Sequence, residues 1–514
     1  MTHWIIVPIV LPLLTGGLLV LLERRRENWV APISVASAIG FLLVALLLLQ
    51  RADTGALQAY LLSNWQAPFG IALALDRLSA LMLLLLAVVA LASLTYALGG
   101  DARRGAHFHA LFHFQLMGLA GAFLTADLFN LFVFFEVLLA ASYGLLLHGQ
   151  GPGVAQRLKA SVHYVVFNLT GSALFLIAVS LLYGLTGTLN MADLAVKIAQ
   201  LGPENQRLAQ AAALMLLVVF AVKAALLPLY FWLPDTYASA TAPVAALFAI
   251  MSKVGVYAVL RTTTLIFGVQ MAQPMLPLLA LATLVLAAIG ALASTRLRGL
   301  VAYLVVGSAG LLLLAVGLGT PGTVAAAVFY IVHSTLVGAL LFLLADRIAA
   351  ARGGGDALQA TPLQGGWAPL GVAFFIAAVA AAGMPPLGGF FGKALLLQAA
   401  GTTAMAGWVI TLVLASSLVL MVSLGRAGST LFWRAGSAPG AALQRHGTHS
   451  AALAALVAGL AAVAVLAGPL SAYAQATAAQ LFERQTYIRS VLGAQPVPAA
   501  IDVRKEMRER GELK

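Results

Sequence analysis

The sequence has no cysteine and little charge. Its 514 residues include 17 acidic and 29 basic side chains, so only 9% are charged, whereas 62% are hydrophobic. The absence of cysteine excludes iron–sulfur clusters held by thiolates and zinc sites built from cysteine within this chain. The scarcity of charge excludes a soluble globular domain of this length, because such domains carry about 25% charged residues.

Long apolar runs take the place of the missing polar sequence. Runs of about 20 apolar residues recur along the whole chain, which is the length that a helix needs to cross a bilayer. The short alternating strands of a membrane β-barrel are not seen. We therefore expect an all-α polytopic membrane protein with about fourteen transmembrane helices. The expected spans lie near residues 4–22, 30–49, 76–98, 107–124, 128–147, 162–184, 208–232, 239–264, 275–293, 299–318, 322–345, 367–397, 405–432 and 451–470.

The net charge of +12 arises mainly from basic residues in the loops between the spans. Cytoplasmic loops of membrane proteins are enriched in Lys and Arg, so topology explains the excess better than nucleic-acid binding does. The loops expected to be cytoplasmic hold Arg24, Arg25, Arg26, Arg103, Arg104, Arg157, Lys159, Arg296, Arg298, Arg347, Arg352, Arg426, Arg434 and Arg445. Both termini then face outward, although the tail after Pro469 is itself basic. We predict a multi-pass protein of the bacterial cytoplasmic (inner) membrane, with the lipid bilayer as its surroundings.

Two of the spans are interrupted. The stretch 214–260 contains Pro228, Pro234 and Pro243, and the stretch 374–397 contains the sequence AGMPPLGG. Proline removes a helical hydrogen bond that lipid cannot replace, so such a break usually lines a polar cavity inside the protein.

The two interrupted helices stand five spans apart, which is typical of a transporter built from inverted repeats. Because five is odd, the second repeat enters the membrane upside down. The predicted division is into N-terminal helices 1–3 (1–106), a first inverted repeat of helices 4–8 (107–264), a second of helices 9–13 (275–432), and helix 14 with the C-terminal tail (433–514).

Five ionisable residues lie near the middle of expected spans: Glu136, Lys223, Lys253, His333 and Lys393. A charged side chain at the bilayer centre costs about 2.5–3.5 kcal/mol on insertion scales, so such residues usually have a function. We predict a proton path in the membrane plane, with Glu136 and Lys223 as an ion pair that handles protons at its entrance. The alternatives are a structural ion pair, lysines bonded to the carbonyls of a broken helix, and a histidine that is only packed.

Other polar residues have weaker predictions. His163 is a possible accessory group for proton conduction, and Asp127 is expected to cap the fifth span, with a possible accessory role. Asp76 is expected at the membrane interface. His109 and His113 have the i, i+4 spacing of metal ligands, but they stand at a basic rim, so no metal is predicted. Neither a cofactor nor a catalytic residue is expected.

Three blocks of sequence resemble a known family. They are FNLFVFFEVLL with Glu136, AVKAALLPLYFWLPDTYASATAPVAALFAIMSKVGVYAVLR with Lys223 and Lys253, and AGMPPLGGFFGK with Lys393. They are similar to the proton-translocating membrane subunits shared by respiratory complex I and the multisubunit Mrp cation/proton antiporters, over roughly residues 70–430. The resemblance implies fourteen helices, two inverted five-helix repeats, and broken helices 7 and 12. It also implies a proton path through the five residues named above, with His333 as the loosest match.

Within the family, the chain looks most like the D subunits of Mrp antiporters in its length and in the sequence around Glu136. Complex I homologues often have a histidine before the tryptophan of the WLPD block, where this chain has Phe231. The resemblance implies a secondary transporter subunit, not an enzyme, with the A, B, C, E, F and G subunits as partners and H⁺ and Na⁺ or K⁺ as transported ions. The alternatives are a proton-pumping subunit of complex I or of a membrane-bound hydrogenase, and a scaffold subunit without transport.

Overall fold

The structure is a computed structural model that describes residues 2–24, 26–149, 153–273, 275–363, 367–435 and 447–496. Arg25, Arg445, the middle of the GQGPG loop and the basic tail from residue 497 onward lie outside these ranges, so the predictions made on them are not addressed. The described chain is almost entirely helical, which confirms the expected all-α membrane class.

The elements of the first half alternate between long apolar helices and short connections. They are η1 (Thr2–Ile5), α1 (Val7–Glu23), α2 (Glu27–Asp53), β1 (Gln58–Leu61), η2 (Leu62–Asn64), β2 (Ala72–Leu75), α3 (Arg77–Ala97), η3 (Asp101–Arg103), α4 (Phe108–Leu124), α5 (Leu128–Leu147), α6 (Val154–Thr186), α7 (Met191–Ala199), α8 (Pro203–Ala224), α9 (Trp232–Ser239), α10 (Ala242–Phe248), α11 (Met251–Thr262), η4 (Thr263–Phe267) and η5 (Val269–Ala272).

The second half continues the same way. Its helices are α12 (Met275–Ala293), α13 (Leu297–Leu318), α14 (Pro321–Ala351), α15 (Ala368–Ala382), α16 (Gly388–Ala400), α17 (Ala406–Gly428), η6 (Ser429–Trp433), α18 (Gly447–Val465), α19 (Ala467–Phe482) and α20 (Arg484–Leu492). Eleven helices of the described chain are long and apolar enough to cross a membrane, and three shorter apolar helices bring the number to fourteen, matching the expected spans one by one.

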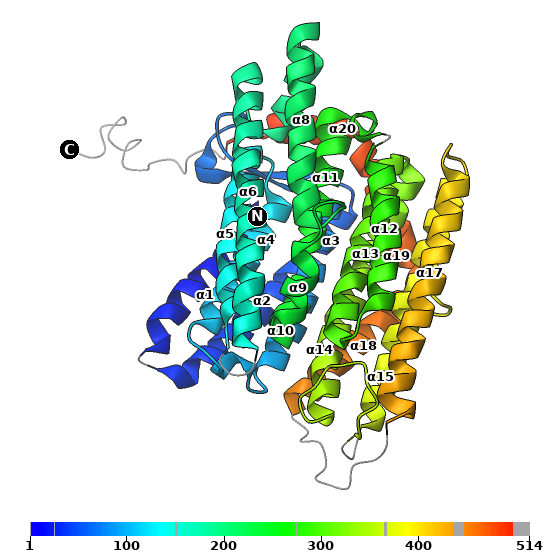
Figure 1. Ribbon diagram of the computed structural model, residues 1–514. Helices are drawn as coiled ribbons and strands as arrows, with labels where there is room; N and C mark the ends of the chain where they lie inside the picture. The colour runs from blue at the N-terminus through cyan, green and yellow to red at the C-terminus, as the bar shows by residue number, and fades with distance from the viewer. Residues whose placement is uncertain are drawn as a thin grey trace, which may run out of the picture.

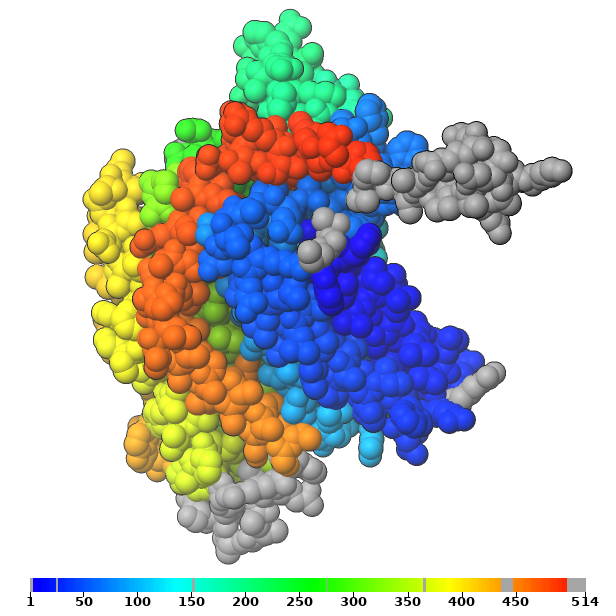
Figure 2. Space-filling view, turned by 180° about the vertical axis from the view of Figure 1, so that it is seen from behind, coloured from blue at the N-terminus to red at the C-terminus, as the bar shows by residue number. Residues whose placement is uncertain are grey.

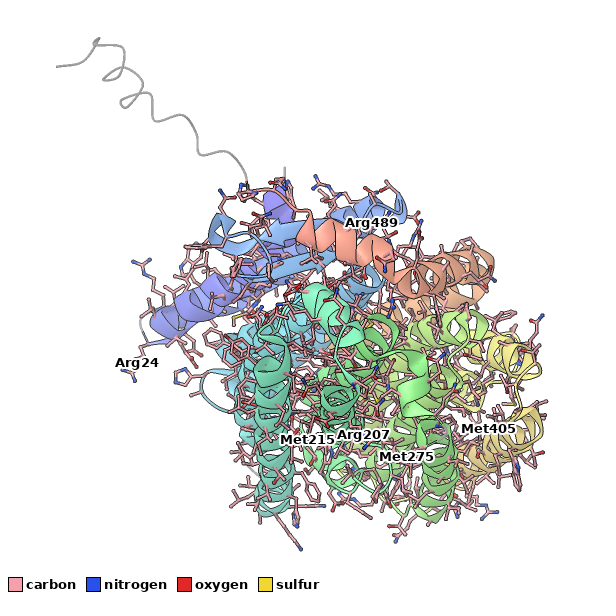
Figure 3. All side chains as sticks on the ribbon, turned by 90° about the horizontal axis from the view of Figure 1, so that it is seen from above. Arg24, Arg207, Met215, Met275, Met405 and Arg489 are labelled. Atoms are coloured by element: carbon pink, nitrogen blue, oxygen red, sulfur yellow. The ribbon has the colours of Figure 1, made fainter. Side chains whose placement is uncertain are left out.

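The spans form a bundle whose centre differs from its edges (Figure 1). The segment 242–267, which comprises α10, α11 and η4, is buried throughout, and α13 and α14 are nearly so. By contrast, α2, α6, α17 and α18 expose most of their apolar surface, as helices in contact with lipid do. Viewed from above, the cross-section is elongated, with Arg24 and Met405 at opposite ends (Figure 3).

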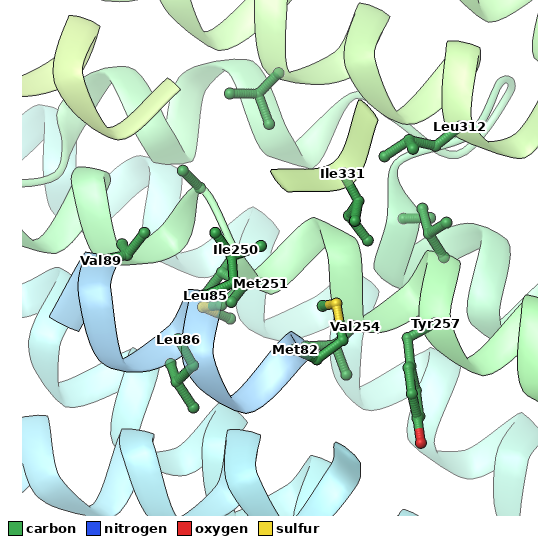
Figure 4. Close-up of a cluster of buried hydrophobic side chains, with 14 of the residues drawn as sticks. Met82, Leu85, Leu86, Val89, Ile250, Met251, Val254, Tyr257, Leu312 and Ile331 are labelled. Carbon is green, nitrogen blue, oxygen red and sulfur yellow. The ribbon is translucent and has the colours of Figure 1, made fainter. Parts of the chain in front are cut away.

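The centre is packed by side chains from α3, α11, α13 and α14 and by Ile250, just before α11 (Figure 4). Met82, Leu86, Ile250 and Leu312 are almost completely buried there, and Tyr257 of the same cluster donates a hydrogen bond to the carbonyl of Phe123 in α4. Because such cores are as tightly packed as organic crystals, they hold the helices that carry buried charges in fixed positions.

A hairpin and the C-terminal helices cover one end of the bundle. Strands β1 and β2 pair in antiparallel fashion, and α20 lies across this end over the N-terminal helices (Figure 2). Tyr473 of α19 donates to the carbonyl of Arg77, and Gln480 bonds both Arg77 and Gly55. His3 contacts Tyr60 of β1, so both ends of the described chain meet on the same side, as an even number of spans requires. Which side faces the cytoplasm stays a prediction.

Asp76 lies at the start of α3, and its position at the membrane interface stays a prediction. Its side chain is buried, and it caps α3 by accepting from the Ser79 amide while a second oxygen binds Arg261 at 2.5 Å. Arg261 is itself buried at the end of α11 beneath Tyr487 of α20. Hydropathy could not reveal this pair, because its partners are 185 residues apart.

Candidate proton-transfer site

The first helix break follows α8. Lys223 lies in the last turn of this helix, and Ala225 then takes a left-handed conformation with φ 58° that ends it. The backbone groups freed by the break find partners inside the protein: the indole of Trp232 donates to the Val222 carbonyl at 2.9 Å, and the Leu227 amide donates to Thr283 at 2.9 Å. The tryptophan of the WLPD block therefore closes the break, as a helix end within a membrane requires.

Glu136 and Lys223 do not form the direct ion pair that the sequence suggests. No nitrogen–oxygen contact within 4.0 Å joins them; instead two polar side chains of α6 approach them. Ser172 donates a short hydrogen bond to the Glu136 carboxylate, and Lys223 Nζ donates to Asn168 Oδ1 at 3.2 Å. The carboxylate remains within electrostatic range of Lys223. Glu136 and Lys223 therefore each have their own partner on α6, four residues apart, and do not contact each other.

Lys253 lies in the middle of the interrupted span formed by α10 and α11. It is completely buried, and its ammonium donates to Ser308 Oγ at 2.5 Å and to Ser252 Oγ at 3.3 Å. Two residues later, Gly255 allows α11 to cross the end of α8: a Cβ at this position would lie 2.5 Å from the Ala224 nitrogen and 2.9 Å from the carbonyl carbon of Lys223. The glycine therefore brings the two lysine-bearing segments together.

The second helix break follows α15. Gly383, with φ 82°, ends the helix, and α16 begins five residues later at Gly388. His333 of α14 approaches the break from the side, and its Nε2 lies 3.1 Å from the carbonyl of Ala380. Because a carbonyl only accepts, Nε2 carries the proton and Nδ1 is left as a buried acceptor without a partner in the described chain.

Lys393 lies on α16 and reaches back to the helix before it. Its ammonium donates to the Ala382 carbonyl at 2.8 Å and to Ser417 Oγ of α17 at 2.9 Å. The first bond occupies a carbonyl at the C-terminus of α15, where a positive charge is favoured. Lys393 also faces a cavity of about 30 Å³.

The structure thus places the five predicted residues in three settings. Glu136 and Lys223 each bond a side chain of α6, Lys253 bonds Ser308 of α13, and His333 and Lys393 both contact the second break.

The two accessory residues lie apart from these groups. His163 is exposed on the outer face of α6 and bonds the Lys159 carbonyl of its own helix. Asp127 caps α5 by accepting from the Asn130 amide, and burial raises the pKa of this carboxyl.

Four hydroxyl or amide side chains belong to the site although the sequence-based predictions missed them: Asn168, Ser172, Ser308 and Ser417. A signal existed for the first two, because positions four apart on a helix share one face and this pair interrupts an apolar span. Ser308 and Ser417 hydrogen-bond backbone carbonyls of their own helices, as many membrane serines do. Nothing in the sequence separates them from such structural serines.

Comparison with known proteins agrees with this geometry. The family described as NADH:quinone oxidoreductase/Mrp antiporter, transmembrane, matches residues 125–420. The D subunit of a probable K⁺/H⁺ antiporter of Rhizobium meliloti is 41% identical, with 96% of this chain and 98% of the relative covered. The D subunit of the Na⁺/H⁺ antiporter of Bacillus subtilis is 36% identical, with 84% and 87% covered. Among solved structures, a chain of the Mrp complex from Dietzia superposes with a TM-score of 0.86 at 27% identity, with 96% and 100% covered.

Proposed function

Because this chain belongs to the NADH:quinone oxidoreductase/Mrp antiporter membrane family, we propose that it is the D subunit of a multisubunit monovalent cation/proton antiporter. It resides in the bacterial inner membrane and acts as a transporter subunit that carries protons to drive Na⁺ or K⁺ efflux. The identity over almost the full length of antiporter relatives supports this function over the alternative of a redox-driven pump.

The observation that carries the mechanism is a set of three buried lysines without carboxylate contacts. In the described chain, neither Lys223, Lys253 nor Lys393 lies within 4.0 Å of an acidic side chain. Their ammonium groups are bonded instead by amide, hydroxyl and carbonyl oxygens of neighbouring helices, which leave the proton free to be passed on. They are therefore suited to exchange protons with their neighbours.

Protons would move along Glu136, Lys223, Lys253, His333 and Lys393. Glu136 with Lys223 forms the input switch, Lys253 and His333 form the relay, and Lys393 is the far end. Moving one charge across the membrane potential is worth about 2.3 kcal/mol per 100 mV, which is ample to drive cation exchange.

The position of Glu136 supports a role for partner subunits. Its side chain is half-buried, and Phe129 and Val133, seven and three residues before it on α5, are exposed. A carboxylate facing hydrocarbon is costly, so we propose that a neighbouring subunit of the complex covers this face. The partners would be the remaining A, B, C, E, F and G subunits of the antiporter.

The test is cation-dependent proton exchange in everted vesicles that contain the whole complex. Glu136→Ala and Lys223→Ala should abolish exchange while the complex still assembles, and Lys159→Ala on the exposed face of α6 is the matched control. Unchanged exchange in the Glu136 and Lys223 variants would refute the proposal. Flavin and iron–sulfur absorbance in the purified complex would instead favour the redox-driven pump.

A further inference from the structure

A second cavity, of about 300 Å³, lies away from the buried lysines, at the end of the bundle opposite α20 (Figure 1). Its walls come from the loops and helix ends around α6, α9, α10, α13 and α14, so it lies between the two halves of the chain. The charged residues that line it are four arginines and two aspartates: Arg104, Arg157, Arg296, Arg298, Asp346 and Asp356. The cavity is therefore large enough for a small ligand and has an excess of positive charge on its walls.

The aspartates neutralise two of the four arginines. Arg296 Nε donates to Asp356 at 2.8 Å, and Arg298 donates to Asp346 at 2.7 Å. A third arginine, Arg104, lies 3.0 Å from Asp101, which is not a wall residue.

Arg157 is the wall arginine that has no acidic partner in the described chain. Its side chain is buried, and its Nη2 donates to the carbonyl of Gly149 at 2.5 Å. Arg104 and Arg298 lie within electrostatic range and disfavour a further positive charge there unless an anion compensates for it. Because a guanidinium has five donors in a planar fork, Arg157 keeps donors for such an anion.

Uncharged donors face the same space. Thr241, which lines the cavity just before α10, is 6% exposed, and its hydroxyl has no hydrogen-bond partner in the described chain. A buried hydroxyl without a partner is costly, so an acceptor is expected. Helix α6 also begins at the cavity wall with Gly153, and no side chain caps its first amides. Such amides, together with the helix dipole, favour an anion.

We infer that this cavity binds a phosphate group. Arg157, the Thr241 hydroxyl and the first amides of α6 are the direct donors, and the other three arginines supply positive charge around them. Donors that come from different helices suit the tetrahedral oxygens of phosphate better than the two coplanar oxygens of a carboxylate.

One wall acceptor refines the ligand chemistry. Asp356 Oδ2 is buried and has no hydrogen-bond partner in the described chain. A phosphate-bearing ligand that also has an O–H donor satisfies this oxygen, as hydrogen phosphate and phosphatidylglycerol both do. Basic pockets at the cytoplasmic ends of membrane helices bind anionic lipid headgroups, and the arginines lie on the side predicted to face the cytoplasm. The phosphate therefore belongs to an anionic lipid headgroup or to a soluble phosphate, which the experiment separates.

The position of the site predicts what binding does. Arg157 and Thr241 belong to the first half of the chain, whereas Arg296 and Arg298 belong to the second. A phosphate held by both halves joins them, and any ligand that binds the folded state raises its melting temperature. This inference goes beyond the proposed function, because binding is measured without transport.

The test uses the complex purified through this chain and stripped of lipid in a neutral detergent. Its melting temperature is measured with inorganic phosphate against chloride at equal ionic strength, and with short-chain phosphatidylglycerol against phosphatidylcholine. A rise with inorganic phosphate identifies a soluble ligand, and a rise with phosphatidylglycerol alone identifies a lipid headgroup. No rise with either would overturn the inference.

Variants locate the effect. Arg157→Gln should raise the ligand concentration at half the shift about tenfold, because it removes a charge-assisted bond. Thr241→Val, which keeps the shape but lacks the hydroxyl, should raise it by a smaller factor. The control is Arg426→Gln: this arginine of α17 bonds the carbonyls of Leu292 and Ser294, does not line the cavity, and should leave the concentration unchanged.

The same concentration in the wild type, Arg157→Gln and Thr241→Val would contradict the inference. If Arg157→Gln prevents assembly, Thr241→Val decides, because it removes only a hydroxyl: a raised concentration supports the site and an unchanged one overturns it. Since the readout is binding and not exchange, a failure of the proposed function in the vesicle assay leaves this result unaffected.

Discussion

The two helix breaks hold their lysines by different means. At the first break Lys223 ends the half-helix itself, bonds the side chain of Asn168, and has the Glu136 carboxylate in electrostatic range. At the second break Lys393 follows the gap, bonds the Ala382 backbone carbonyl, and has no carboxylate within 4.0 Å in the described chain. The first lysine is held by charge and a side-chain amide, the second by a backbone carbonyl and the hydroxyl of Ser417.

This difference indicates different tasks. A lysine whose proton affinity depends on a nearby carboxylate responds when that carboxylate is protonated or covered, as an input switch must. A lysine bonded to a fixed backbone carbonyl has a nearly constant environment, which suits a terminal carrier that is filled and emptied by its neighbours.

Helix α11, which carries Lys253, and helix α16, which carries Lys393, are also secured differently. Helix α11 is fixed at its far end by the buried pair of Arg261 and Asp76, both less than 5% exposed. In the described chain α16 has no ion pair, and it is fixed by close contacts of Gly389 and Gly392 with neighbouring groups. The first half should therefore be sensitive to loss of charge and the second to added volume.

The largest expected effect comes from breaking the buried pair. Asp76→Asn leaves the Arg261 guanidinium buried without its counter-charge, which typically costs about 3–5 kcal/mol of stability. We expect a marked fall in the melting temperature of the purified complex. Asp53→Asn is the control, since Asp53 is mostly exposed in its contact with Arg77 and such surface pairs contribute about 0–1 kcal/mol. Equal melting temperatures of Asp76→Asn and Asp53→Asn would show that the first half is not especially sensitive to loss of buried charge.

The same pair gives a pH dependence with a definite sign. Burial alone would raise the pKa of Asp76, but Arg261 and the Ser79 hydrogen bonds outweigh burial and hold the pKa below its usual value of 3.8. Since the folded-state pKa is depressed, the stabilisation is present above about pH 3.8 and is lost as the pH falls through the lower folded value. The difference in melting temperature between the wild type and Asp76→Asn should thus stay constant from about pH 8 to 5 and shrink only below about pH 4.

An intermediate effect is expected from Gly389→Ala at the second break. The added Cβ would lie 2.1 Å from the Ala380 carbonyl oxygen, and the oxygen belongs to a helix end that cannot yield easily. Overpacking of this kind costs about 1–3 kcal/mol, so both thermal stability and exchange should fall. Gly425→Ala on α17, where no atom lies within 4 Å of the added Cβ, should leave both unchanged or raise stability slightly. If Gly389→Ala leaves thermal stability and exchange unchanged, close backbone packing is not what fixes α16.

The smallest effect is expected from Asn168→Ala at the first break. The variant removes the side chain bonded to Lys223 but leaves Glu136 in place, and a hydrogen bond to a charged group is worth about 1.5–3 kcal/mol. The remaining carboxylate compensates for part of the loss, so exchange should fall about fivefold and assembly should persist. Leu169→Ala, on the exposed face of the same helix, should have little effect in the same vesicle assay. A complete loss on removing Asn168 would mean that the amide, and not the carboxylate, governs Lys223.

The sequence by itself determined the fold class, the number of spans and the positions of both breaks. These follow from hydropathy and from proline and glycine. Their effects extend over one or a few turns of helix, so short stretches of sequence reveal them. It also identified the five ionisable residues within the spans, because a charged side chain in hydrocarbon is costly at any position along a span. Their proposed roles and the repeat relationship of the halves stay predictions.

Only the tertiary structure decided the partners of these residues. It gave Glu136 the partner Ser172 and Lys223 the partner Asn168, connected Lys253 to Ser308 across 55 positions, and paired Asp76 with Arg261 across 185. The physical reason is that a hydrogen bond depends on where side chains of separate helices meet, and helix packing is a cooperative property of the whole bundle. A serine that also binds a buried lysine and one that bonds only its own helix look the same until that packing is known.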